Sequence, residues 1–302
     1  MQQSKKIRTI NEYHRLRRFA EPAHPLISIV DLATVPVEHN ITGVVIDFYS
    51  VCIKRSSNIK LKYGQQEYDF ESGVMFFMSP NQVFSLYSDA NEKPKQSGWL
   101  LLIHPDFFWN TTLAKKIKRY EFFDYSANEA LFLSQKEETT INGIIENIRQ
   151  EYHSNIDKFS KEIIVSQIET LLNYSERFYS RQFITREKAN HQILERLEKL
   201  LTNYFNSDDL ISKGLPTVQY VANKLNVSPS YLGGILRMLT GQNTQQHIHE
   251  KLIEKAKEKL STTNLSISEI AYELGFEHSQ SFSKLFKTKT QLSPLEFRQS
   301  FN

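Results

Sequence analysis

The spacing of hydrophobic residues changes along this chain. From residue 26 to about residue 103, short runs of β-branched and aromatic residues, such as Gly43–Ile53 and Val74–Met78, alternate with turn clusters rich in Ser, Asn and Gly. About seven such runs at regular spacing predict short strands in a small antiparallel β-barrel or a sandwich. The preceding residues 1–25 are polar and basic, and predict an arm that is poorly ordered unless it docks.

After His104 the spacing becomes helical. Four isoleucines and a tyrosine recur at intervals of three and four residues, which predicts an amphipathic helix over about 134–155. These residues are Ile141, Ile144, Ile145, Ile148 and Tyr152. A similar stripe predicts a second helix over about 160–182. The two helices either cover an open face of the barrel or also pair with a second subunit.

The polar stretch 183–192 predicts a linker. Apolar residues at helical spacing from Ile193 to Phe205 then open a second domain, 193–302. The prediction is therefore an N-terminal arm (1–25), a β-rich domain with flanking helices (26–182) and an all-α domain, which makes the fold class α+β.

Residues 266–287 predict a helix, a tight turn and a second helix. Ser266 and Glu269 have the spacing of a capping box, and Gly275 can adopt the positive φ that ends the first helix. The second helix turns two phenylalanines and a leucine inward, and no acidic residue occurs from His278 to Thr290. A buried first helix under a basic, polar second helix is typical of a DNA-reading helix-turn-helix, although any all-α domain can contain such a hairpin.

This hairpin has an earlier copy. The apolar positions of 218–227 recur 49 residues later, and those of 232–236, past the turn, recur 50 residues later. Ser228 and Pro229 begin the second helix of that copy as N-cap and first helical residue. A helix over His247–Leu260 joins the copies and would fix their spacing; two reading helices must lie roughly 34 Å apart to enter successive major grooves.

Charge favours a nucleic-acid partner for the last third of the chain. Residues 215–302 hold ten Lys and Arg against seven Asp and Glu, whereas the 27 basic and 27 acidic residues of 1–214 cancel, so the whole net charge of +3 lies there. The single cysteine, Cys52, excludes an internal disulfide and suits a reducing cytoplasm. No apolar run is long enough to span a membrane, and no secretory signal is present. We therefore expect a cytoplasmic protein without a membrane partner.

Residues 193–302 resemble the DNA-binding domain of AraC/XylS-type transcription regulators. The resemblance is carried by SISEIAYELGF, FSKLFK, LSPLEFR and VANKLNVSPSYL, and by the A-x-x-x-L of the connecting helix. It implies a seven-helix bacterial module with two helix-turn-helix units on double-stranded promoter DNA. The N-terminal β segment then looks like that family's cupin-like sensing and dimerisation domain. A homodimer, a small-molecule effector and RNA polymerase are the further partners that the resemblance implies.

Ten residues are candidates for DNA binding. In the second hairpin they are His278, Ser279, Gln280, Ser283, Lys284 and Lys287. In the first hairpin they are Ser230, Gly233, Gly234 and Arg237. Gln280 can pair bidentately with adenine, and a lysine such as Lys284 can donate to guanine O6 and N7. Lys287 and Lys289 are expected to hold phosphates, which position the protein without specifying sequence.

Three features depart from the family pattern. Gly233 and Gly234 stand where members usually carry side chains that touch DNA. Either the first hairpin reads bases poorly, or the glycines let its helix sit closer to the groove. Leu252 stands where many members have an arginine, and Gln291 where a glycine is common.

No catalytic or metal-binding set stands out. His247 and His249 lie two apart on a helix and point to different faces, and the region Ile59–Glu71 lacks the His-x-His of a metal-binding cupin. We expect no cofactor and no enzyme activity. The leading prediction is a sequence-specific DNA-binding transcription regulator with signal sensing by its N-terminal domain. A cupin-like enzyme with an accessory nucleic-acid module and a DNA-binding protein without a ligand remain as alternatives.

Overall fold

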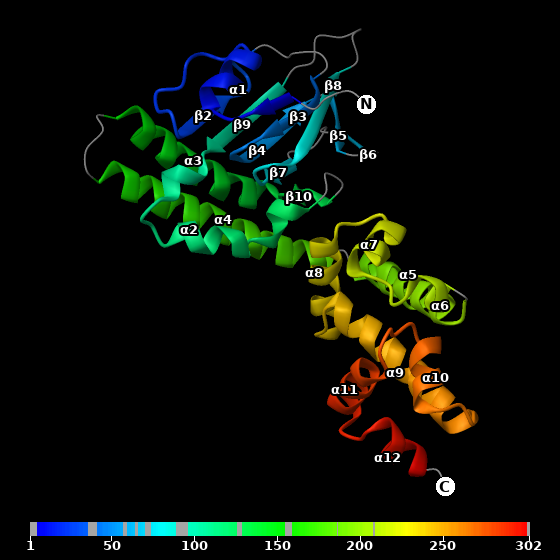
Figure 1. Ribbon diagram of the computed structural model, residues 1–302. Coiled ribbons are helices and arrows are strands. Elements are labelled where there is room, and N and C mark those ends of the chain that lie inside the picture. Colours follow the sequence, from blue (N-terminus) through cyan, green and yellow to red (C-terminus); the bar gives the residue numbers. More distant parts are fainter. Residues whose placement is uncertain are drawn as a thin grey trace. The chain divides into compact units, whose positions relative to one another are not determined.

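A computed structural model describes residues 5–35, 41–56, 59–63, 66–69, 74–88, 96–125, 129–154, 159–185, 187–207 and 209–300. The chain divides into two units, Met1–Thr185 and Arg186–Asn302. Strands and two long helices make up the first unit, and helices make up the second (Figure 1). The α+β class predicted from the hydrophobic pattern is confirmed.

Two five-stranded sheets form the first unit. The strands are β1 (Lys5–Ile7), β2 (Ile27–Asp31), β3 (Ile41–Ile46), β4 (Tyr49–Ser56), β5 (Ile59–Tyr63), β6 (Gln66–Asp69), β7 (Val74–Met78), β8 (Val83–Ser88), β9 (Gln96–Ile103) and β10 (Leu131–Phe132). One sheet has the order β1-β3-β8-β5-β6 and the other β10-β7-β4-β9-β2. Over the described strands neither sheet closes on itself, so the predicted cupin-like barrel is not observed. The pairing of β1 with β3 is parallel, which also departs from an antiparallel barrel.

A shared hydrophobic core joins the two sheets. Val44 and Phe84 come from the first sheet, and Leu100 and Leu102 from the second, and all four are buried in one cluster. The longest ladder pairs β4 with β9 from Tyr49↔Ile103 to Ser56↔Gln96. Both strands are rich in β-branched, leucine and aromatic residues, which suit a pleated and largely buried surface.

The N-terminal arm docks on this core. A capping box of Thr9 and Glu12 begins α1 (Ile10–Leu16), because the Thr9 side chain accepts from the Glu12 amide at 3.1 Å. Ile10 and Tyr13 are buried from that helix, and Ile7 from β1. The arm predicted for 1–25 is therefore an integral part of the first unit wherever the structure describes it.

Short helices and two long ones complete the first unit. They are η1 (Pro105–Phe108), α2 (Leu113–Lys116), η2 (Ile117–Arg119), η3 (Glu121–Asp124), α3 (Gln135–His153) and α4 (Ser160–Thr185). The two long helices confirm the predictions for 134–155 and 160–182, and the α3 stripe is buried as expected. Within the predicted linker at 183–192, α4 ends at Thr185 and α5 starts at Glu187, and the boundary between the two units falls between Thr185 and Arg186.

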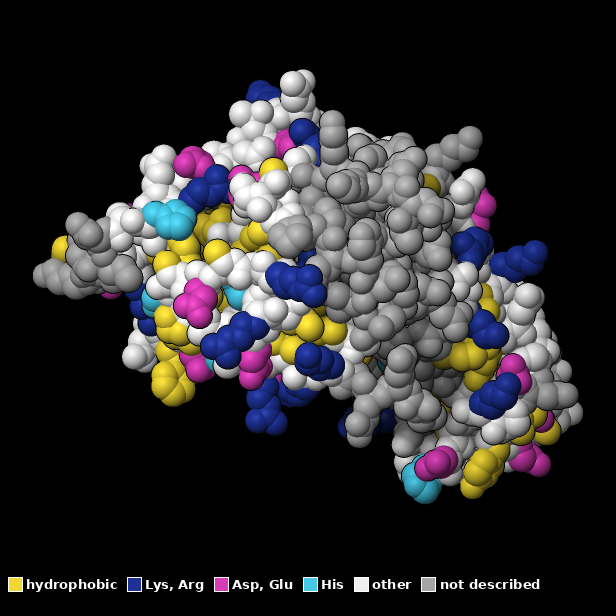
Figure 2. Space-filling model, turned by 90° about the horizontal axis from the view of Figure 1, so that it is seen from above, with side chains coloured by type: hydrophobic (Ala, Val, Ile, Leu, Met, Phe, Trp, Pro, Cys, Tyr) yellow, Lys and Arg dark blue, Asp and Glu magenta, His cyan; other side chains and the backbone are white. Residues whose placement is uncertain are grey.

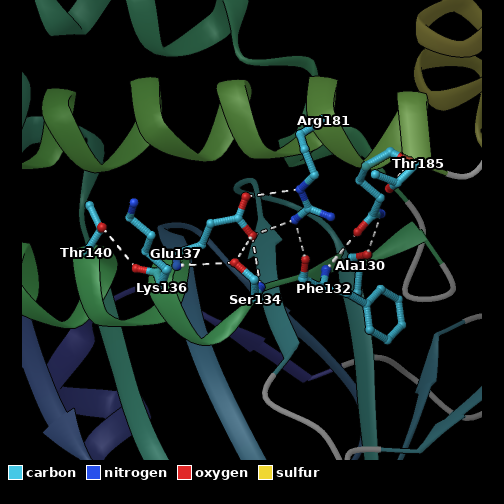
Figure 3. A network of polar contacts seen from close by, with 9 residues as sticks. Ala130, Phe132, Ser134, Lys136, Glu137, Thr140, Arg181 and Thr185 are labelled. Carbon is cyan, nitrogen blue, oxygen red and sulfur yellow. Dashed lines mark hydrogen bonds and ion pairs between the residues drawn. The ribbon is translucent and has the colours of Figure 1, made fainter.

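An ion pair fastens α3 to α4 (Figure 3). Arg181 donates to both carboxylate oxygens of Glu137, at 3.0 and 2.7 Å, and to the Phe132 carbonyl of β10 at 2.7 Å. Burial of Glu137 acts to raise its pKa, but hydrogen bonds from Ser134 and Arg181 hold that pKa below its usual value. The pair holds the C-terminal end of α4 against the start of α3.

The second unit has one core. Its helices are α5 (Glu187–Phe205), α6 (Asp209–Lys213), α7 (Val218–Leu225), α8 (Pro229–Thr240), α9 (Thr244–Thr262), α10 (Ile267–Glu273), α11 (Ser279–Thr290) and α12 (Pro294–Gln299). In the described part of this unit that makes eight helices rather than seven, because the short α6 adds one. Leu225 and Leu236 of the first hairpin share a buried cluster with Ile270 and Phe286 of the second. Both hairpins are therefore fixed by the same packing.

Candidate nucleic-acid interface

The second hairpin consists of α10 and α11. Ser266 caps α10 as predicted, since its side chain accepts from the Glu269 amide at 3.2 Å while Glu269 accepts from the Ser266 amide at 2.6 Å. The backbone hydrogen bond from Ser266 lowers the pKa of Glu269. Gly275 ends the helix at φ 79°, and a Cβ there would lie 2.7 Å from the Leu210 carbonyl. Only glycine meets both the left-handed backbone and this close approach to α6.

An aromatic column holds α11 from the inside. Phe282 and Phe286 are fully buried and lie 5.7 Å apart, measured between ring centroids. Phe276, at the corner between the helices, lies 5.6 Å from Phe282, and Phe297 of α12 lies 5.4 Å from Phe286. Each large ring contributes roughly 1.5–3 kcal/mol on burial. The rotation of α11 about its axis is thereby fixed, and with it the direction of its opposite face.

The opposite face of α11 carries the predicted polar set. Gln280, Lys284 and Lys287 are exposed, and Ser279 and Ser283 are half-buried. Because Gln280, Lys284 and Lys287 are spaced by four and three residues, they form one stripe. The structure thus brings these predicted residues together on one helix, with amide, hydroxyl and ammonium groups that can donate to base edges or phosphates.

The start of α11 differs from the start of α8. Ser228 accepts from the Tyr231 amide at 3.2 Å and so caps α8, which has Pro229 at its first position. His278 is the N-cap of α11, and its exposed side chain makes no capping hydrogen bond. The first-turn amides of α11 therefore have no side-chain cap from that residue, although the Ser281 amide donates to the His278 carbonyl at 3.1 Å. The start of a helix can bind an acceptor such as a phosphate oxygen.

The first hairpin, α7 and α8, repeats this scaffold. Asn226 adopts φ 59° at the end of α7, the position that Gly275 occupies 49 residues later. The Val227 amide donates to the Ala222 carbonyl at 3.1 Å, and the matching pair, Phe276 and Ala271, lies at 3.0 Å. The internal repeat predicted from apolar spacing therefore extends to the hydrogen bonds of the turn.

The outer face of α8 is poorer in polar groups. Gly233 is buried, and a Cβ added there would lie 3.5 Å from an Nη atom of Arg237, which is ordinary contact distance. Gly234 and Ser230 are half-buried, and Arg237 is exposed. Of the four predicted residues on α8, the structure therefore places only the Arg237 side chain fully at the surface. Packing leaves room for a methyl group at position 233, so it does not require glycine there.

Helix α9 sets the distance between the hairpins. Asn243 caps it in a box with Gln246, and Ile248 and Leu252 lie buried along one side as predicted. Nineteen residues make a helix about 28 Å long. Lys259 forms an ion pair of 2.6 Å with Glu273 of α10, which ties the far end of α9 to the second hairpin. Leu252, which replaces a common arginine, is a core residue.

Sequence reasoning missed a polar pair on α9. The Gln245 amide nitrogen lies 2.8 Å from His249 Nε2. Burial lowers the pKa of His249, and the nearby Lys289 charge of α11 lowers it further. His249 therefore lies close to one of the lysines expected to hold phosphate. No local pattern in the sequence links these two residues, because they lie 40 positions apart and only the fold brings them together.

The described residues were also searched for a metal site, a membrane-spanning helix and a large charged patch. No group of three His, Cys, Asp or Glu side chains there could hold a metal ion. The region Ile59–Glu71, where a cupin-type metal site was considered, has no described side chains. No helix of the described residues is long and apolar enough to cross a membrane. On the described part of the face in Figure 2, Lys and Arg side chains are interspersed with Asp and Glu, so no large single-sign patch marks it.

Comparison with known proteins agrees with the two hairpins. A helix-turn-helix domain family matches residues 221–300. The activator AarP of Providencia stuartii is 30% identical over 109 residues, which are 36% of this chain and 73% of AarP. The chain belongs to the AraC-type family of helix-turn-helix, DNA-binding transcription regulators.

Two further relatives are transcription regulators. The arabinose operon regulatory protein of Escherichia coli is 28% identical over 127 residues, covering 42% of this chain and 43% of that protein. The Msm operon regulatory protein of Streptococcus mutans is 38% identical over 81 residues, covering 27% and 29%. AarP excepted, the chain spans about half or less of the length of such relatives.

Proposed function

We propose that this chain regulates transcription by binding double-stranded promoter DNA at a specific sequence, with both hairpins in successive major grooves. The observation that carries the proposal is the repeated hairpin on a single core, with an outward polar stripe on α11. The length of α9, about 28 Å, suits a separation close to one turn of DNA, roughly 34 Å. Gln280 and Lys284 read bases, and Lys287 and Lys289 hold phosphates.

In this proposal the two hairpins contribute unequally. The second supplies base contacts from α11, and its first-turn amides donate to a phosphate beside His278 and Ser279. The first supplies Arg237 and the backbone around Gly233 and Gly234, and acts mainly in positioning. Specificity then resides largely in the half-site that α11 contacts.

The first unit is proposed to dimerise and to sense a signal. Support for dimerisation comes from exposed apolar side chains near the start of α4: Trp109 is 71% exposed, Phe159 52% and Ile163 43%. They lie near one another, because Lys161 donates to the Trp109 carbonyl at 2.9 Å. An apolar patch of this kind favours a homodimer interface. RNA polymerase is proposed as a further partner and the cytoplasm as the location.

Selection of binding sites from random DNA, followed by titration at several salt concentrations, tests the DNA-binding proposal. We expect one enriched motif and an affinity that falls steeply as salt rises, because phosphate contacts release counterions. Lys284→Ala should relax the motif at one position. Lys289→Ala should weaken all sequences alike, while Lys213→Ala, a change to an exposed lysine on α6, serves as the control. Affinity that is indifferent to both salt and sequence would contradict the proposal.

A further inference from the structure

A groove runs along the free edge of β2. This strand ends its sheet, with β9 as its neighbour on the other side. A cavity of about 200 Å³ lies beside it, bounded also by residues 19–23 and by Tyr152 and His153 at the end of α3. Ala20 and Glu21 are exposed at its rim, so the cavity opens to solvent. Among the described residues that line it, β2 is the one strand, which places the groove at the sheet edge.

The free edge of β2 presents an unpaired backbone donor and acceptor. On the β9 side, the Leu26 carbonyl accepts from the His104 amide at 2.8 Å, and the Leu32 amide donates to the Gly98 carbonyl at 2.9 Å. Because such positions alternate along an antiparallel strand, Ile29 turns its own amide and carbonyl away from β9. Neither group has a hydrogen-bond partner among the described residues, although Ile29 is only 9% exposed. Backbone groups shielded from water in this way normally have a partner.

The open stretch of this edge is short. Ile27 forms a β-bridge with His24 at one end of the strand. At the other end, the Asp31 carbonyl accepts from the Thr34 amide at 3.2 Å. Between them the edge admits one pair of backbone hydrogen bonds, but not a long added strand. Since a cavity of about 150 Å³ holds a benzene molecule, the groove has room for a ligand of roughly two or three small residues.

Acidic side chains flank the open stretch. Asp31 lies two residues beyond Ile29, and Glu21 belongs to the opposite wall. One oxygen of Asp31, Oδ1, accepts from the Ala33 amide at 2.9 Å, and neither carboxylate has a cationic partner among the described residues. No Lys or Arg lines the groove in the described part of the chain. A cleft lined by one sign of charge concentrates ligands of the opposite sign, so the groove favours a cation.

Hydrogen bonds hold the wall that faces β2. The Tyr152 hydroxyl accepts from the Ala23 amide at 2.7 Å. His14, which also lines the groove, donates from Nδ1 to the Ala20 carbonyl, because a carbonyl can only accept, and its Nε2 accepts from the Ser28 hydroxyl at 2.9 Å. Burial lowers the pKa of His14, which agrees with this neutral form. The groove is therefore formed before a ligand arrives, which reduces the ordering cost of binding.

We propose that this groove binds a short peptide, about three residues long, that has a free N-terminus. In an antiparallel arrangement the second residue of the peptide pairs with Ile29, donating to its carbonyl and accepting from its amide. The first residue then lies opposite Val30, which brings the N-terminal ammonium close to Asp31. Phe19 and Val35 offer apolar surface to a side chain of the peptide. The site requires neither the DNA binding nor the signal sensing proposed above.

Calorimetric titration of the full-length protein tests the ligand class. The probes are trialanine amide and its variants with Val, Leu or Phe at one position, all with a free N-terminus. We expect at least one of them to bind. Acetylation of its N-terminus, which removes the charge, and N-methylation of its second residue, which removes the donor to the Ile29 carbonyl, should each weaken binding roughly tenfold or more. No binding by any of these peptides, or equal binding by the acetylated form, overturns the proposal.

Variants and hydrogen exchange locate the bound peptide. Asp31→Asn keeps the oxygen that accepts from Ala33 but removes the charge, so it should weaken binding roughly tenfold. Glu162→Gln, which changes an exposed carboxylate on α4, is the matched control and should bind normally. The Ile29 amide should exchange more slowly with the peptide than without it, because it gains a hydrogen bond. Full binding by Asp31→Asn, or unchanged exchange at Ile29 in the saturated complex, would place the peptide elsewhere and overturn the assignment.

Discussion

The two hairpins of the second unit share a scaffold and differ in what they present. Each has a capped first helix, a residue in the left-handed region and a backbone hydrogen bond that closes the turn. Gln280 and Lys284 are exposed on α11 in the second hairpin, whereas the positions of α8 that lie 50 residues earlier hold Ser230 and Gly234, both half-buried. The buried residues therefore preserve the fold of both hairpins, while the exposed residues are free to differ. The same scaffold can in this way present two different surfaces to DNA.

The largest expected difference between the two hairpins is the loss of stability on substitution of the residue that ends the first helix, Gly275 in the second hairpin and Asn226 in the first. Gly275→Ala should destabilise the second unit by about 3 kcal/mol, because the new Cβ meets the Leu210 carbonyl at 2.7 Å in a left-handed backbone. Asn226→Ala, at the matching position of the first hairpin, should cost about 1 kcal/mol, since asparagine already carries a Cβ at φ 59°. Urea denaturation followed by circular dichroism measures both. Equal losses would mean that the close approach to α6 contributes nothing.

Base reading is the next difference to test. Lys284→Ala should lower discrimination between the selected site and a single-base variant by roughly 1–3 kcal/mol. Arg237→Ala should instead weaken the selected site and its variants by one common factor. Competition binding at fixed salt measures both ratios. If Arg237→Ala also relaxed the sequence preference, specificity would be shared by both hairpins, and the unequal roles proposed here would be wrong.

A substitution at Gly233 tests why α8 has glycine at this position instead of a residue whose side chain could contact DNA. Gly233→Ala should raise the free energy of unfolding by about 1 kcal/mol, because alanine favours a helix interior and its Cβ finds ordinary contact at 3.5 Å from Arg237. Affinity for the selected DNA site then separates the two interpretations. Unchanged affinity would mean that Gly233 only deprives α8 of a side chain that could contact a base. Reduced affinity in the more stable variant means that DNA approaches the backbone there.

Much of the second unit could be predicted from the sequence because its signals are local. Capping residues lie three apart, and the apolar stripe of α9 repeats every four residues, so helix ends and faces follow from short windows. The outward set on α11 followed from the same periodicity. The burial of Gly233 did not, because Arg237 covers it through a side-chain conformation that periodicity does not specify.

The fold of the first unit was harder to predict from the sequence than that of the second. Its sheets pair residues far apart in the chain, such as Lys5 with Val44. The sequence of a short strand does not specify which other strand it pairs with. A barrel was expected where two sheets form, and an arm where β1 and α1 dock. A cavity between the two sheets is lined in part by Arg17 and Lys54, which lie 37 positions apart, so no local pattern could reveal it.

The smallest effect concerns the ends of the two outer helices. Gly241 ends α8 at φ 74°, and Gln291 ends α11 at φ 66° in the equivalent place, where the backbone favours glycine. Gln291→Gly should stabilise the second unit by about 0.5–1 kcal/mol, because relief of the left-handed strain exceeds the added entropy of the unfolded chain. Denaturation with urea measures this, with Gly241→Ala as the reverse change. A loss of stability would show that the contact of the Gln291 amide nitrogen with the Thr288 carbonyl, at 3.4 Å, outweighs the strain.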